Sequence, residues 1–173
     1  CSSLTFAASA NVILYEKAIP MFIDVDLKFW TVDLNLLEKA FKRYKPKIFI
    51  AVDIYGQCCD YDSISFLCNK YNVKLIEDAA EALGSEYKKS KAGSFGSIGI
   101  VSFNGNKIIT TSGGGMLLSD NEKYVKKTRF LSTQSREPFL HYEHNELGFN
   151  YRLSNLLAAL GRTQLSKIDD FSK

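Results

Sequence analysis

Residues 73–81, VKLIEDAAE, decide the fold, because a short apolar run ends there in acidic residues. The run Val73 to Ile76 predicts a buried strand. Before it, apolar residues recur at helical spacing from Ile64 to Tyr71, and Asn72 is suited to a left-handed helix end. A helix followed directly by a buried strand is typical of folds in which the two alternate.

The same alternation continues on both sides of this stretch. Apolar runs of strand length occur at residues 21–25, 47–52, 98–103 and 116–118. A capping box at Asn35 and Glu38 predicts a helix start, and Ser154 is suited to cap a further helix. We therefore expect an α/β fold with a mainly parallel sheet, and one domain, because no linker-like segment interrupts the chain.

The composition is that of an ordinary globular protein and excludes several function classes. The chain has 173 residues, of which 46% are hydrophobic, and a net charge of +3. Lysine clusters at 88–91 and 123–127 lack the interleaved aromatic residues of a nucleic-acid groove, so we expect a solvated surface there and no nucleic-acid partner. No run reaches the roughly 18 apolar residues of a membrane span, so no membrane partner is expected.

The cysteines and histidines do not predict a metal site. Cys1, Cys58, Cys59 and Cys68 have no C-x-x-C spacing, which argues against a disulfide framework or a zinc knuckle and favours a reducing cytoplasm. Residues 141–144, HYEH, offer two imidazoles, but no further ligand converges on them. We expect an exposed polar loop there and no metal.

Polar side chains follow two of the predicted strands, where α/β sheets bind their ligands. Taken alone, the strand-end Asp78 would be structural and Lys107 would lie on the surface. However, apolar and small residues flank Lys107, and the loss of solvation favours a nucleophilic amine. An acid for a pyridinium nitrogen and an amine for an aldehyde are what pyridoxal phosphate requires, so the two residues predict a site for that cofactor.

Four motifs then carry a family resemblance. They are EDAA at 77–80, GSFG at 93–96, SFNGNK at 102–107 and GGM at 114–116. In this order they resemble the DegT/StrS-type nucleotide-sugar aminotransferases, which are fold type I pyridoxal-phosphate enzymes. The likeness extends to residues 3–7, 22–26, 55–57 and 148–154. It implies the three-layer α/β/α large domain of that fold type, with a mainly parallel central sheet.

The resemblance implies roles for four residues. Lys107 matches the Schiff-base lysine, which also moves a proton between substrate and cofactor. Asp78 matches the aspartate that keeps the pyridine nitrogen protonated. Ser102 matches a hydroxyl donor to the cofactor phosphate, and Phe6 stands where the family places an aromatic ring against the pyridine face.

Two further positions complete the implied site. Asn150 matches an asparagine that reaches the phosphate bound by the neighbouring subunit, which implies a homodimer with a shared active site. Glu81 is implied to lie near the cofactor's phenolic oxygen, where many members have histidine or glutamine. A glutamate can donate a hydrogen bond there only when it is protonated. The related dehydratases carry histidine in place of Lys107, so the lysine favours transamination.

The finer resemblance concerns the substrate. Residues 102–111 and 141–144 look most like enzymes that aminate C4 of a UDP-linked 4-keto-6-deoxy sugar, as in bacillosamine-type sugars, usually with glutamate as the amino donor. The alternatives are a binding or regulatory protein that keeps the fold without catalysis, and an inactive fragment. Residues 1–173 are expected to be the cofactor-binding large domain, with a phosphate-binding segment upstream and a C-terminal small domain outside this sequence.

Overall fold

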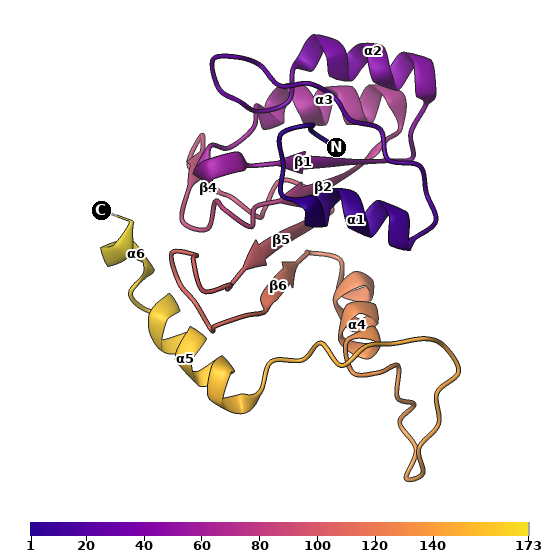
Figure 1. Ribbon diagram of the computed structural model, residues 1–173, viewed down its shortest axis with the longest axis vertical. Helices are drawn as coiled ribbons and strands as arrows, with labels where there is room; N and C mark the ends of the chain where they lie inside the picture. The colour runs from indigo at the N-terminus through magenta and orange to yellow at the C-terminus, as the bar shows by residue number, and fades with distance from the viewer. Residues whose placement is uncertain (173) are drawn as a thin grey trace.

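A four-stranded sheet forms the centre of the molecule (Figure 1). In the computed structural model, which describes residues 1–172, the strands lie in the order β1 (Ile48–Val52), β2 (Lys74–Asp78), β5 (Ile98–Ser102) and β6 (Gly115–Leu118). β1, β2 and β5 are parallel, and β6 is antiparallel to β5. The predicted α/β class with a mainly parallel sheet is confirmed.

Helices and short elements precede, connect and follow these strands. They are α1 (Ala7–Tyr15), α2 (Leu34–Tyr44), η1 (Ile54–Gly56), α3 (Tyr61–Tyr71), the hairpin strands β3 (Glu86–Tyr87) and β4 (Ser90–Lys91), α4 (Glu122–Leu131), α5 (Asn155–Leu165) and α6 (Ile168–Phe171). Residues 132–154, called the arm below, join α4 to α5 and project away from the sheet (Figure 1).

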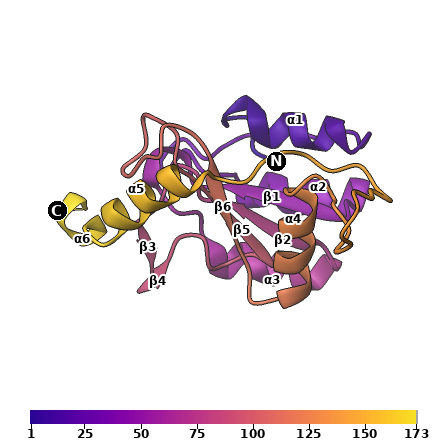
Figure 2. The same ribbon diagram turned by 90° about the horizontal axis from the view of Figure 1, so that it is seen from below.

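Alternation along β1 explains why helices cover both faces of the sheet. Phe49 and Ala51 belong to the larger apolar cluster, which includes buried residues of α2 and α3. Ile50 and Val52 belong to a smaller cluster, against which Ile13 of α1 packs. Burying an aliphatic or aromatic side chain of this size stabilises a fold by about 1.5–3 kcal/mol. Figure 2 shows α1 on one side of the sheet and α3 on the other, which is the expected three-layer arrangement.

The start of α2 differs from the prediction. Asp33 is the N-cap, and its carboxylate accepts hydrogen bonds from the backbone N–H groups of residues 35 and 36 (2.8 and 2.9 Å). The capping box at Asn35 is therefore wrong, because the aspartate two residues earlier takes the free N–H groups of the first turn. Glu38 instead accepts a hydrogen bond from Lys70 of α3 (2.8 Å), which lowers the pKa of Glu38 to about 2.

Two predicted strands also differ from the structure. Residues 21–25 form only isolated bridges, because Ile23 exchanges single hydrogen bonds with Cys1 and Ser3 before the segments separate. β2 continues to Asp78, because it pairs there with both β1 and β5. The other predicted helix boundaries are confirmed, since Asn72 ends α3 with φ of 55° and Ser154 caps α5.

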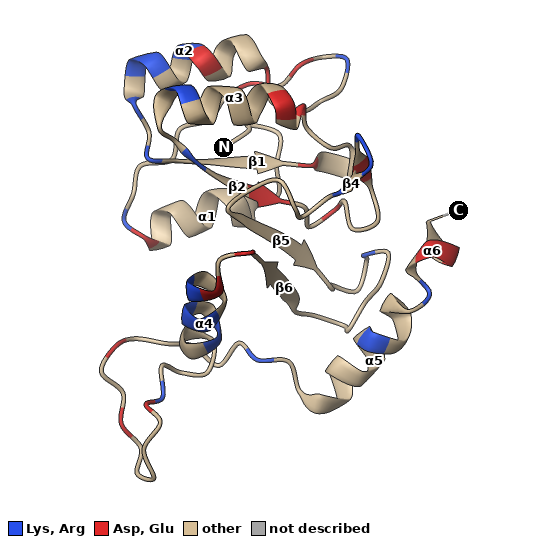
Figure 3. Cartoon of the chain, turned by 180° about the vertical axis from the view of Figure 1, so that it is seen from behind, with Lys and Arg blue, Asp and Glu red and all other residues tan. Residues whose placement is uncertain are grey.

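Both lysine clusters lie on the surface, as predicted. Figure 3 shows Lys and Arg positions concentrated along α4, none of whose residues is buried. Residues 141–144 lie in an exposed part of the arm, where His141 contacts Glu143 (3.0 Å). In residues 1–172, no His, Cys, Asp and Glu side chains gather into a group suited to a metal ion. No described helix is long and apolar enough to cross a membrane.

Candidate active site

Asp78 lies at the carboxyl edge of the sheet, at the end of β2. Its backbone pairs with Val52 of β1 and Ile100 of β5. Its Oδ2 accepts a hydrogen bond of 2.5 Å from the hydroxyl of Ser9 in α1, and its Oδ1 accepts one of 3.1 Å from the N–H of Ala80. These two donors hold the carboxylate in one orientation.

Ser9 is part of the site although the sequence did not indicate it. It lies in the first turn of α1, is buried, and accepts a hydrogen bond of 2.9 Å from the hydroxyl of Thr5. Because Thr5 supplies this donor, the Ser9 hydroxyl hydrogen is directed to Asp78. The sequence of this helix, AASANVILY, does not single out Ser9, because Asn11 is a second polar residue in it.

A cavity of about 370 Å³ lies at the same edge of the sheet. It is lined by Tyr55, Ala80, Glu81, Leu83, Ser102, Asn106, Lys107 and Ile108. Volumes of about 300–1,000 Å³ are usual for small-molecule sites. Three residues of the predicted site, Glu81, Ser102 and Lys107, thus share one cavity, and Asp78 lies beside it through its contact with Ala80.

The loop between β5 and β6 places Lys107 at this cavity. Ile109 is buried in the larger apolar cluster and anchors the loop. The backbone N–H and C=O of Thr110 form hydrogen bonds of 2.8 and 2.9 Å with the side chain of Gln164 in α5. The sequence did not indicate this role of Gln164, because it depends on a contact between segments distant in sequence.

Glu81 contacts two other residues of the cavity. Its Oε1 lies 3.6 Å from Nζ of Lys107, and its Oε2 accepts a hydrogen bond of 2.7 Å from the backbone N–H of Tyr55. The side chain of Lys107 is 17% exposed and that of Glu81 is 28% exposed. The lysine amine therefore lies against a carboxylate and is partly shielded from water.

The side chains at this edge fit pyridoxal phosphate. Ser102, the last residue of β5, accepts a hydrogen bond of 3.3 Å from the N–H of Asn104, and no described group accepts its hydroxyl hydrogen. That hydrogen is free for a phosphate oxygen. The amine of Lys107 suits an aldehyde and the carboxylate of Asp78 suits a ring nitrogen. The phosphate, the aldehyde and the ring nitrogen of the cofactor thus have matching side chains here.

Two other predicted residues do not line the cavity. Phe6 is the N-cap residue of α1 and its side chain is 74% exposed. Asn150 is exposed in the arm, where it forms an isolated bridge with Thr133. The structure thus leaves Phe6 near Ser9 with its ring in solvent and does not bring Asn150 to the cavity of its own chain.

A buried pair of acids lies behind the site and was missed in the sequence. Glu77 accepts hydrogen bonds from the N–H groups of Gly93 and Phe95. Oδ1 of Asp53 accepts hydrogen bonds from the N–H of Cys59 (2.9 Å) and the hydroxyl of Tyr61 (2.8 Å). Oδ2 of Asp53 is buried without a partner among the described residues. Burial raises the pKa of Asp53 to about 7, so this acid is readily protonated.

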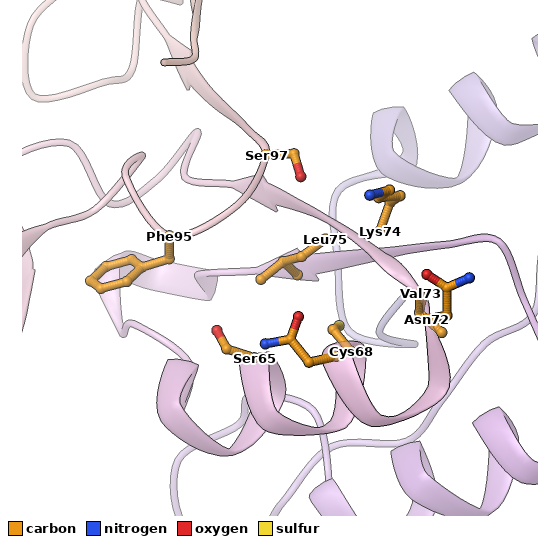
Figure 4. A pocket seen from close by; sticks show the side chains of 9 residues that line it. Ser65, Cys68, Asn72, Val73, Lys74, Leu75, Phe95 and Ser97 are labelled. Atoms are coloured by element: carbon orange, nitrogen blue, oxygen red, sulfur yellow. The ribbon is translucent and has the colours of Figure 1, made fainter. Parts of the chain in front are cut away.

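A second cavity, of about 270 Å³, lies at the amino ends of the strands (Figure 4). It is formed by Lys74 at the start of β2, Ser97 before β5, and Ser65 and Cys68 of α3. Burial raises the pKa of Cys68 to about 11, so its thiol is a weak nucleophile near neutral pH. Because α/β enzymes bind their ligands at the carboxyl ends of the strands, we favour the first cavity as the active site.

Known proteins match the chain along almost its whole length. The model of the DegT/DnrJ/EryC1/StrS aminotransferase family matches residues 1–173. EpsN of Bacillus subtilis, named as a pyridoxal phosphate-dependent aminotransferase, is 54% identical over 98% of this chain and 45% of its own length. The GDP-perosamine synthase of Caulobacter vibrioides is 41% identical over 97% of this chain and 45% of its own length.

A solved structure gives the same match. PseC of Helicobacter pylori, an aminotransferase involved in the biosynthesis of pseudoaminic acid, superimposes with a TM-score of 0.91 at 29% identity. The match covers 98% of this chain and 46% of that protein. The chain therefore spans about half the length of the relatives it matches.

Proposed function

Because the chain belongs to the DegT/DnrJ/EryC1/StrS aminotransferase family, we propose that the whole protein transfers an amino group to a keto group of a nucleotide-linked sugar. The family predicted from the sequence is confirmed, and so is its class, the pyridoxal-phosphate-dependent enzymes. One observation carries the proposal for this chain. The amine of Lys107 lies in a cavity with Ser102, beside the fixed carboxylate of Asp78.

In this proposal each of the three residues has a separate task. When bound, pyridoxal phosphate supplies a protonated ring that withdraws electrons from the substrate carbon. Asp78, oriented by Ser9, holds the proton on the ring nitrogen. Ser102 donates its free hydroxyl hydrogen to a phosphate oxygen. Lys107 anchors the cofactor through Nζ and, once Nζ is free, moves a proton to or from the substrate carbon.

The proposed site is completed by Phe6 and by a second copy of the protein. The exposed ring of Phe6 would pack against the pyridine face. Asn150 would reach the phosphate bound by the other copy, so the protein is proposed to be a homodimer with shared active sites. The arm that carries Asn150 exposes apolar side chains such as Leu140 and Leu147, which supports contact with another chain.

The proposed substrate is a UDP-linked 4-keto-6-deoxy sugar, aminated at C4 with glutamate as the donor. Motif resemblance in residues 102–111 and 141–144 supports UDP, whereas three relatives are named GDP-perosamine synthase. Both nucleotides therefore belong in the test. The proposed location is the cytoplasm, and the four free thiols agree with a reducing compartment.

Borohydride reduction of the full-length protein loaded with pyridoxal phosphate, followed by peptide mapping, tests the proposal. The cofactor should be trapped on Lys107, and trapping on another residue would contradict it. Amino transfer from glutamate to UDP- and GDP-linked 4-keto-6-deoxy sugars should then be measured by mass spectrometry of the sugar product. Trapping on Lys107 without transfer to either sugar would favour a binding or regulatory protein.

A further inference from the structure

Glu81 has a geometry that its expected place near the cofactor does not explain. One carboxylate oxygen lies 3.6 Å from the amine of Lys107, and the other accepts the hydrogen bond from Tyr55 N–H. No other carboxylate in the described part of the chain lies within 4.0 Å of the Lys107 amine. Glu81 is therefore the negative charge that this lysine faces.

The distance between the two charged groups indicates how they interact. At 3.6 Å the amine and the carboxylate are an ion pair but are too far apart for a hydrogen bond of ordinary length. Charge attraction of this kind holds a lysine near one place without fixing its geometry. The amine can therefore leave Glu81 and return to it at little cost.

The second contact of Glu81 fixes a strained part of the cavity wall. Tyr55 has φ of 52°, a left-handed conformation that is unfavourable for a residue with a side chain. The hydrogen bond from its N–H to Glu81 helps to hold that conformation. Since Tyr55 also lines the cavity, the carboxylate of Glu81 contacts both the cavity wall and Lys107.

We propose that Glu81 is a positioning residue, which holds the ammonium group of Lys107 at the cavity whenever the amine is not bonded to the cofactor. The proposal rests on the proposed function in that it concerns the cofactor lysine. During amino transfer the amine of Lys107 is released from the cofactor and must later bond to it again. A charged partner keeps the amine close to the cavity in the meantime. Glu81 acts through Lys107 and is not itself assigned a catalytic step.

Chemical labelling of Lys107 in the full-length apoprotein tests this role without cofactor or substrate. Lysine acetylation by acetic anhydride at about pH 8 reports the neutral, accessible amine. In Glu81→Gln the charge is lost, while an oxygen remains to accept from Tyr55 N–H. The initial rate at Lys107, measured by peptide mass spectrometry, should rise about two- to fivefold, as expected for loss of a partly exposed ion pair. Glu81→Asp, which keeps the charge, should restore most of the slow labelling.

Glu86→Gln is the matched control, because Glu86 pairs with Lys91 (2.7 Å) on the hairpin. It should leave the rate at Lys107 unchanged. An equal or lower rate at Lys107 in Glu81→Gln, or no labelling in either protein, would overturn the proposal. If Glu81→Gln fails to fold, the original protein is labelled at low and at high salt: a rate at Lys107 that rises with salt supports the proposal, because salt screens the ion pair, and an unchanged rate overturns it. Because no cofactor is present, this result is independent of where borohydride traps the cofactor.

Discussion

Ser9 and Asp78 are 69 residues apart in sequence, yet the Ser9 hydroxyl donates a hydrogen bond of 2.5 Å to Oδ2 of Asp78. The bond joins α1 to the end of β2 at the edge where the cavity lies. It is reinforced by Thr5, whose hydroxyl donates to Ser9. The orientation of the carboxylate proposed to bind the cofactor ring thus depends on a helix near the start of the chain.

We expect Ser9→Ala to weaken cofactor binding. The change removes a hydrogen bond to a carboxylate, and such bonds contribute about 1.5–3 kcal/mol, so the dissociation constant for pyridoxal phosphate should rise at least about tenfold. Fluorescence titration of the full-length apoprotein measures it. Ser3→Ala is the control, because the hydroxyl of Ser3 donates only an exposed hydrogen bond of 3.3 Å, to Asp24. Unchanged affinity in Ser9→Ala would show that the bond does not orient Asp78 for the cofactor.

Lys107→Ala should separate cofactor binding from turnover. The contacts of Asp78 and Ser102 remain, so the variant should still retain pyridoxal phosphate after gel filtration. Turnover should fall by about 10²- to 10⁴-fold, because the group that moves the proton is lost. Lys91→Ala, at an exposed lysine, is the control for a general effect of removing positive charge. Full transaminase activity in Lys107→Ala would contradict the proposed mechanism.

The residues of the site that could be predicted from the sequence are those with a local signal. Asp78 and Lys107 each follow an apolar strand, and the rule for sheet edges brings such residues together. Ser9 and Gln164 carry no such signal, since each acts through one contact with a segment more than 50 residues away. Their roles depend on tertiary packing, which periodicity does not report.

The same limit applies to the fold. Strand β1 was predicted because burial on both faces gives a continuous apolar run. The run at 21–25 is also largely apolar, but Ile23 bridges only to Ser2 and Val25 only to Val32, so these residues form isolated bridges. A strand requires a partner of matching length as well as a suitable sequence.

Asp53→Asn should stabilise the protein at alkaline pH. The pKa of Asp53 is raised from 3.8 to about 7 in the folded state, mainly by burial, so between these pH values the folded protein holds a proton that the unfolded chain has released. The contribution of this acid to the free energy of unfolding is therefore largest below about pH 4 and falls until about pH 7. Asparagine keeps an acceptor for Cys59 and Tyr61 and places an N–H₂ group at the unpartnered oxygen.

Urea unfolding of the full-length protein at about pH 5 and about pH 8 measures this effect. At the higher pH the variant should be more stable than the original by about 1 kcal/mol or more, and the difference should shrink at the lower pH. Asp62→Asn is the control, because Asp62 is exposed and pairs with Lys88. A variant less stable than the original at both pH values would mean that Asp53 is needed as a carboxylate.

Gly99→Ala should destabilise the sheet beneath the site. Gly99 lies in β5, and a Cβ added there would meet the carbonyl oxygen of Gly93 at 2.0 Å and its carbonyl carbon at 2.6 Å. Both atoms belong to the backbone of the loop that Glu77 holds, so neither can move as a flexible side chain would. Overpacking of this kind costs about 1–3 kcal/mol or more. The midpoint of urea unfolding should fall accordingly.

Gly113→Ala is the control. Nothing lies within 4 Å of the new Cβ there, so this variant should change stability by less than about 1 kcal/mol. Equal midpoints for the two variants would mean that β5 can move away from the loop, and that the two do not pack as one unit.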